Sequence, residues 1–88
     1  MTYVNARLLT FGKVREIANV NDKEISVPSK IKCFELKKII FQEILPAIQE
    51  MEKTCIIAVN QSYVYDEMEV LNLTDGCEIA VIPPISGG

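Results

Sequence analysis

The residues Glu-Ile-Ala-Val-Ile at positions 78–82, followed at once by Pro-Pro-Ile-Ser-Gly-Gly at positions 83–88, decide the fold of this chain. The first five residues are apolar at nearly every position, a pattern typical of a strand with neighbours on both sides. We therefore expect residues 78–82 to form a central strand of the sheet. The two prolines that follow favour an extended course, so residues 83–88 are expected to leave the sheet as a tail.

Working back from that strand, four earlier segments have the pattern of strands. Residues 3–9 and 24–27 alternate between apolar and polar side chains, which predicts two half-buried strands that pair like a hairpin. Residues 13–18 predict a short helix in their connection, with Val14, Ile17 and Ala18 on one, buried face. Residues 55–59 are apolar throughout and predict a strand covered on both faces, and residues 63–65 predict a short strand after a turn.

The longest helical pattern begins near Lys32, and Lys37 and Lys38 fall on its polar arc. Its apolar stripe has the three-and-four spacing of a helix that covers a sheet; the stripe consists of Cys33, Phe34, Leu36, Ile40, Phe41, Ile44 and Leu45. Pro46 predicts an end or a kink, with a second short helix at residues 47–53. The fold class is therefore α+β, a mixed sheet with one main covering helix, in which residues 1–82 form a single domain and residues 83–88 a tail.

The composition excludes several classes of function. A chain of 88 residues with 49% hydrophobic and 24% charged residues is one globular domain and not a disordered segment. Its net charge of -3 argues against nucleic acid as a partner. The sequence has no histidine, which excludes the Ser-His and Cys-His dyads and zinc sites with histidine ligands.

The cysteines and the apolar runs indicate a compartment. Cys33, Cys55 and Cys77 contain no CxxC pair, so we expect neither a disulfide framework nor a metal site, and we interpret all three as packing residues without a catalytic role. No apolar run approaches the roughly 20 residues that cross a bilayer, and the first residues lack a secretory pattern. We expect a cytosolic protein that does not associate with membranes.

The tail has a composition that suits docking. Residues 79–88 carry no charged side chain, so the carboxylate of Gly88 is the only formal charge expected there. Pro83 and Pro84 stiffen the arm, Ile85 is an apolar side chain on it, and the glycines at its end can enter a slot that a larger residue would block. A disordered tail is the alternative interpretation of the two glycines.

Charge is unevenly distributed along the chain. Residues 1–32 carry six basic and three acidic side chains, and residues 33–88 carry three basic and nine acidic ones. The acidic half is either a solvated surface or a patch that steers a basic partner.

The tail, together with the preceding Asp75-Gly76-Cys77-Glu78, closely resembles the family of small, sulfur-carrying molybdopterin synthase subunits. Phe11-Gly12-Lys13-Val14-Arg15-Glu16 is similar to that family's Phe-Ala-x-x-Arg-Glu segment, with Gly12 in place of the usual alanine. Residues 58–61 and 63–64 match its central hairpin. The resemblance covers essentially the whole chain and implies a ubiquitin-like β-grasp fold.

The resemblance also implies a mechanism at Gly88. An ATP-using, E1-like activating enzyme would place AMP on the Gly88 carboxylate, and a sulfurtransferase would supply the sulfur that turns it into a thiocarboxylate. The chain binds no permanent cofactor in this scheme. The arm would then enter the large subunit of molybdopterin synthase, in a heterotetramer, and sulfur would pass to the pterin precursor of molybdopterin.

The same resemblance assigns roles to individual residues. Gly88 is the chemical residue, Gly87 provides clearance, and the remaining tail residues guide the arm; these are Pro83, Pro84, Ile85 and Ser86. Phe11 and Arg15 are expected to face the large subunit, with an edge aromatic and a solvated charge as their alternative interpretations.

Three other functions stay open. The chain could be a sulfur carrier of the thiamine pathway, or a ubiquitin-related modifier used for protein conjugation or transfer-RNA thiolation. It could also be a docking module with no chemistry at Gly88. Enzyme activity of the chain by itself is not expected, because the sequence has neither a nucleotide-binding loop nor a plausible acid–base pair.

Overall fold

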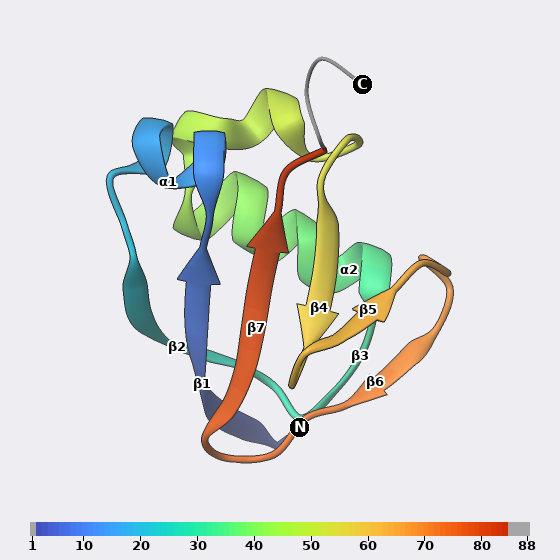
Figure 1. Cartoon of the computed structure of the whole chain (residues 1–88). Helices are drawn as coiled ribbons and strands as arrows, with labels where there is room; N and C mark the ends of the chain where they lie inside the picture. The colour runs from blue at the N-terminus through green and yellow to red at the C-terminus, as the bar shows by residue number, and fades with distance from the viewer. Residues whose placement is uncertain (1, 85–88) are drawn as a thin grey trace.

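The computed structural model describes residues 2–84, and its centre is a five-stranded mixed sheet (Figure 1). The order across this sheet is β2-β1-β7-β4-β5. Its strands are β1 (Tyr3–Thr10), β2 (Asp22–Pro28), β4 (Ile56–Val59), β5 (Ser62–Val64) and β7 (Cys77–Ile82). β1 and β7 run parallel and the other neighbours run antiparallel. The predicted central strand is confirmed, and so are the mixed sheet and the pairing of the first two strands.

All the helices lie on one face of this sheet (Figure 1). They are α1 (Gly12–Ala18), α2 (Cys33–Lys38), a π-helical continuation of α2 (Ile39–Ile44) and a 3-10 helix (Pro46–Met51). The main helix and the second short helix were expected, and their buried side chains include Leu36, Ile40 and Phe41. These pack against the inner side chains of the sheet, of which Leu8, Ile57 and Ile79 are almost completely buried.

A second, two-stranded sheet was not predicted. β3 (Lys30–Lys32) pairs antiparallel with β6 (Val70–Asn72). Each strand has three residues, and its middle side chain, Ile31 in β3 and Leu71 in β6, is buried between two exposed ones. Such a segment is too short to reveal a period of two in the sequence, and only the pairing in the folded chain identifies it.

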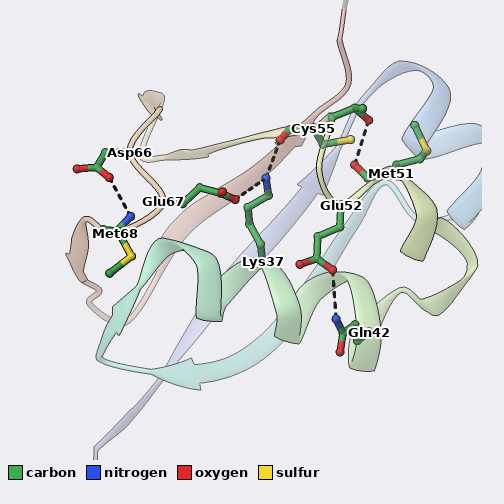
Figure 2. Close-up of polar contacts among 9 residues, drawn as sticks. Lys37, Gln42, Met51, Glu52, Cys55, Asp66, Glu67 and Met68 are labelled. Atoms are coloured by element: carbon green, nitrogen blue, oxygen red, sulfur yellow. Dashed lines mark hydrogen bonds and ion pairs between the residues drawn. The ribbon is translucent and has the colours of Figure 1, made fainter.

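Lys37 corrects the prediction for the main helix. It was expected on the solvated arc, but it is buried with only 6% exposure. The reason is that the residue before β4 and the loop before β6 cover it, as Figure 2 shows. Its Nζ atom donates hydrogen bonds to the Cys55 carbonyl oxygen at 3.1 Å and to Glu67 Oε1 at 3.3 Å. Both contacts satisfy the charge that burial would otherwise penalise.

Ile17 corrects the prediction for the short helix. It was expected on the buried side of α1, together with Val14 and Ala18. Val14 is fully buried, whereas Ile17 is 44% exposed, because a helix of seven residues turns only one narrow side to the core.

Candidate functional site

A row of side chains crosses the face of the sheet that the helices leave open. Leu9 in β1 pairs with Ala80 in β7, Ala80 pairs with Ala58 in β4, and Ala58 pairs with Tyr63 in β5. Residues that pair across neighbouring strands project from the same face of a sheet. The two alanines in the middle of the row are small, and the larger Leu9 and Tyr63 stand on either side of them.

The small centre of this row forms the floor of an apolar groove. Its volume is about 330 Å³. It is lined by Leu9, Phe11, Ala58, Gln61, Tyr63, Glu78, Ala80 and Ile82. Phe11 is 41% exposed and Tyr63 is 51% exposed, so two aromatic rings rise from the edge of the groove into solvent. Within residues 2–84 no helix covers this face (Figure 1).

The tail begins beside this groove. Ile82, the last residue of β7, lines the groove and is followed by the half-buried Pro83 and the exposed Pro84. Because β1 and β7 are parallel, with Thr10 opposite Val81, both strands end on the same side of the sheet. The turn that leads from β1 into α1 therefore lies next to the first residues of the tail. The predictions for Ile85, Ser86, Gly87 and Gly88 concern residues outside the described range.

Phe11 and Arg15, the predicted partner-binding residues, are brought together in that turn. The Arg15 guanidinium lies over the Phe11 ring, 5.5 Å from its centroid, and Arg15 Nε donates a hydrogen bond of 3.1 Å to the Thr10 carbonyl oxygen. The hydroxyl of the buried Thr10 donates in turn to the Val20 carbonyl oxygen. These contacts hold Phe11 at the edge of the groove.

A cluster of charged residues lies around Arg7, near the middle of β1. Arg7 forms an ion pair with Asp22 of β2, and its Nη1 atom lies 3.7 Å from Glu78 Oε2 of β7. The hydrogen bond from Arg7 holds the pKa of the Asp22 carboxyl below its usual range. The groove thus runs from a charged end at Glu78 to an apolar end at Phe11 and Ile82.

The cysteines lie away from the groove. All three are free thiols and buried. Burial raises the pKa of the Cys33 and Cys55 thiols, which keeps them protonated and weakly nucleophilic. Among residues 2–84 there is also no cluster of three side chains that could hold a metal ion. In the same range, no helix has the length and apolar character needed to cross a membrane.

Sequence reasoning proposed Phe11, Arg15 and the tail as site residues, but it did not propose most of the residues that line the groove. Leu9, Ala58, Tyr63 and Ala80 were assigned to strands without a functional role. The signal that could have found them is the outer face of the last strand. Ala80 and Ile82 are apolar there, although the covering helix packs only on the opposite face.

The fold and the site define a class of protein. A mixed sheet with parallel first and last strands, one main helix on one face and a glycine-ended segment after the central strand is the ubiquitin-like β-grasp arrangement. A solved structure with the same fold is the putative molybdopterin converting factor, subunit 1, from Pyrococcus furiosus. It matches 93% of this chain and 99% of its own with a TM-score of 0.71 and 26% identity.

Sequence comparison makes the assignment more specific. Residues 8–88 match the model of the ThiS family. The human (Homo sapiens) molybdopterin synthase sulfur carrier subunit is 44% identical over 81 residues, which is 92% of this chain and 91% of the human one. The chain therefore belongs to the ThiS family, together with the molybdopterin synthase sulfur carrier subunits that it matches over most of its length.

A further solved structure bears on assembly. It is described as a protein–protein complex of subunits 1 and 2 of the molybdopterin-converting factor from Helicobacter pylori. One of its chains matches 97% of this chain and 100% of its own, with a TM-score of 0.67 and 22% identity, a likeness of fold.

Proposed function

We propose that this protein is a sulfur carrier for molybdopterin synthesis, and that it carries the sulfur as a thiocarboxylate on Gly88. The observation that supports this most directly is the open apolar groove at the base of the glycine-ended tail. A groove there would bind the body of the carrier to a partner while the tail reaches into that partner's active site. The names of the curated relatives point to the same function.

The proposed chemistry has three steps, all at the terminal carboxyl group. In the first, a Gly88 carboxylate oxygen attacks the α-phosphate of ATP, which gives an acyl-adenylate and releases pyrophosphate. In the second, sulfur delivered at the oxidation level of sulfide attacks the acyl carbon, AMP leaves, and a thiocarboxylate remains. In the third, the thiocarboxylate sulfur attacks a carbon of the pterin precursor and displaces an oxygen leaving group, which gives an acyl–sulfur–carbon linkage. Water then cleaves the acyl–sulfur bond, which restores the Gly88 carboxylate and leaves the sulfur on the pterin.

These steps explain why the carrier needs no catalytic base of its own. A carboxylate resists nucleophiles until adenylation supplies a good leaving group, which is the task of the activating enzyme. A thiocarboxylate ionises readily, so its sulfur is nucleophilic without an adjacent imidazole. The absence of histidine from the sequence and the burial of the three thiols both agree with a chain that supplies only its terminus.

The proposed partners share one surface of the carrier. The first is the large subunit of molybdopterin synthase, in a heterotetramer of two small subunits on a dimer of large ones. The second is the E1-like activating enzyme with its sulfurtransferase. Phe11, with Arg15 stacked on it, and Tyr63 are the exposed side chains at the edge of the groove that would contact either partner. Aromatic and arginine side chains dominate many protein interfaces.

In the proposed tail, Pro83 and Pro84 restrict the direction of the chain, and Ile85 and Ser86 guide it into the partner. Gly87 leaves room around the reacting carbonyl group, because a glycine has no side chain to collide with the catalytic groups. Gly88 carries AMP and then sulfur.

The first test is the mass of the C-terminal peptide from protein isolated with its own activating system. Cleavage after Glu78 releases residues 79–88, which contain neither methionine nor cysteine. Oxidation of sulfur side chains therefore cannot imitate the exchange of one oxygen for sulfur. We expect a heavier peptide with the increment on Gly88. An unmodified peptide under active conditions contradicts the proposal.

The second test blocks the carboxylate. One alanine added after Gly88 should abolish thiocarboxylate formation and molybdopterin synthesis, while one alanine added before Met1 serves as the matched control. Binding of the extended chain to the large subunit, measured in parallel, separates the carrier from a docking module. A docking module would retain its function after the extension, and that result would rule out chemistry at Gly88.

A further inference from the structure

The turn between β1 and α1 lies close to Pro83, the first residue of the tail. A methyl group placed on Gly12 would lie 3.3 Å from Cγ of Pro83, which is the first residue after β7. That separation is closer than most contacts of a real Cβ atom, so Pro83 would have to move by a few tenths of an ångström. Gly12 therefore leaves the space that the Pro83 ring uses.

Gly12 is constrained by its backbone as well. Its φ angle is +55°, in the left-handed region that favours glycine. The residues on both sides are fixed, because Thr10 is buried and hydrogen-bonded to Val20 and Arg15 is bonded back to the Thr10 carbonyl oxygen. The turn thus presents a preformed surface to the tail and does not adapt to it easily.

Pro83 has little freedom to move away. Ile82, before it, pairs with Ile56 in the sheet. The ring of Pro83 fixes its own φ angle, and Pro84 restricts Pro83 to an extended conformation. A displacement of Pro83 is consequently passed along the chain as a change in direction. For any arm of five residues, with at most about 3.3 Å per residue, a rotation of a few degrees at its base moves its end by up to about 1 Å.

We propose that Gly12 is a positioning residue that sets the direction in which the tail leaves the sheet. This inference rests on the proposed function, because it assigns the direction of the tail to the presentation of Gly88 to the activating enzyme and the large subunit. Gly12 acts through Pro83 and does not itself touch the reacting atoms. The resemblance of the turn to a Phe-Ala segment makes the glycine a feature of this chain and not of the pattern.

The test compares two glycine-to-alanine variants at positive φ angles, of which only one places its new methyl group against Pro83. Gly12→Ala introduces a Cβ atom at φ +55° against Pro83. Gly76→Ala introduces one at φ +84°, where no atom among the described residues lies within 4 Å. Both variants carry the strain of a positive φ angle, so both should lower the melting temperature. Only Gly12→Ala should shift the NMR signals of Ile82, Pro83 and Pro84.

The functional readout is the rate of thiocarboxylate formation at limiting activating enzyme. We expect Gly12→Ala to lower it roughly ten-fold, less than the about 100-fold that a 1 Å misplacement can cause, because the residues beyond Pro84 can compensate in part. Gly76→Ala should leave the rate within two-fold of the parent, in line with the about two-fold scatter expected where no contact is lost. This comparison of rates requires a parent chain that forms the thiocarboxylate. Failure of the parent chain to form it would overturn the proposed function. The NMR comparison still decides the positioning role in that case.

A double-mutant cycle completes the test. Pro83→Ala removes the Cγ atom that the new methyl group would meet. In the Pro83→Ala background, Gly12→Ala should therefore lower the rate of thiocarboxylate formation no more than Gly76→Ala does. This rescue is the result that a purely structural role for Gly12 does not give. Equal effects of Gly12→Ala and Gly76→Ala on both the tail signals and the rate would overturn the proposal.

Discussion

Lys37 and Cys55 are joined by a hydrogen bond of 3.1 Å from the lysine Nζ atom to the cysteine carbonyl oxygen, across 18 residues of sequence. The same ammonium group lies 3.3 Å from Glu67 Oε1 (Figure 2). Helix α2, the start of β4 and the acidic loop before β6 are therefore held by one side chain. Glu67 remains largely exposed, whereas Lys37 is buried, so these three segments depend more on Lys37 than on Glu67.

Lys37→Ala should destabilise the fold by about 2 kcal/mol, because the Cys55 carbonyl oxygen loses its donor and the buried lysine stem leaves a gap. Urea unfolding followed by circular dichroism measures the change. Lys38→Ala is the matched control on the same helix, since Lys38 is exposed, and it should stay within about 0.5 kcal/mol of the parent. Equal midpoints for the two variants would contradict a structural role for the buried contact.

Ala80→Gln should weaken binding to the large subunit by at least about ten-fold, or about 1.4 kcal/mol, because a longer polar side chain would fill the floor of the groove. Titration calorimetry with the isolated large subunit measures the affinity. Ala47→Gln makes the same exchange at an exposed position of the 3-10 helix, on the opposite face, and should leave the affinity unchanged. If both variants bind like the parent, the groove is not the interface.

Cys33 and Cys55 should react with iodoacetamide at pH 8.5 more slowly in the folded protein than in urea, because both thiols are buried and burial raises their pKa. The raised folded pKa also fixes the sign of the pH effect. Cys33 and Cys55 lower the free energy of unfolding as the pH rises above the ordinary thiol pKa, because the thiols of the unfolded chain ionise before those of the folded chain. Ala47→Cys supplies an exposed thiol as the reference. Peptide mass mapping that finds fast labelling of Cys33 or Cys55 in the folded chain would refute the expectation.

The main helix and the first strand were predictable because their side chains repeat with a clear period over five or more residues. Residues 78–82 predicted the centre of the sheet correctly because both faces of that strand are apolar. β3 and β6 have three residues each, with neither a readable period nor a continuous apolar run. The burial of Lys37 was equally hidden, because it depends on a loop 30 residues away in the sequence.

The candidate site was predicted only where it carries unusual residues. The tail and the pair Phe11 and Arg15 have distinctive sequences, whereas Ala58 and Ala80 are ordinary strand residues until their register places them side by side. Gly12 shows the same limit. Its difference from the usual alanine was visible in the sequence, but its closeness to Pro83 arises only because β1 and β7 end together.

The position of β7 in the sheet also bears on how the protein is made. Among the described residues it is the last strand in the sequence, yet it lies between β1 and β4. Until residues 77–82 have emerged from the ribosome, those two strands lack their common neighbour and the sheet stays split. A chain that stops before residue 77 therefore lacks both a completed sheet and the segment that begins beside the groove. In the proposed function a closed fold is thus a condition for loading, and we expect an incomplete carrier not to be charged with sulfur.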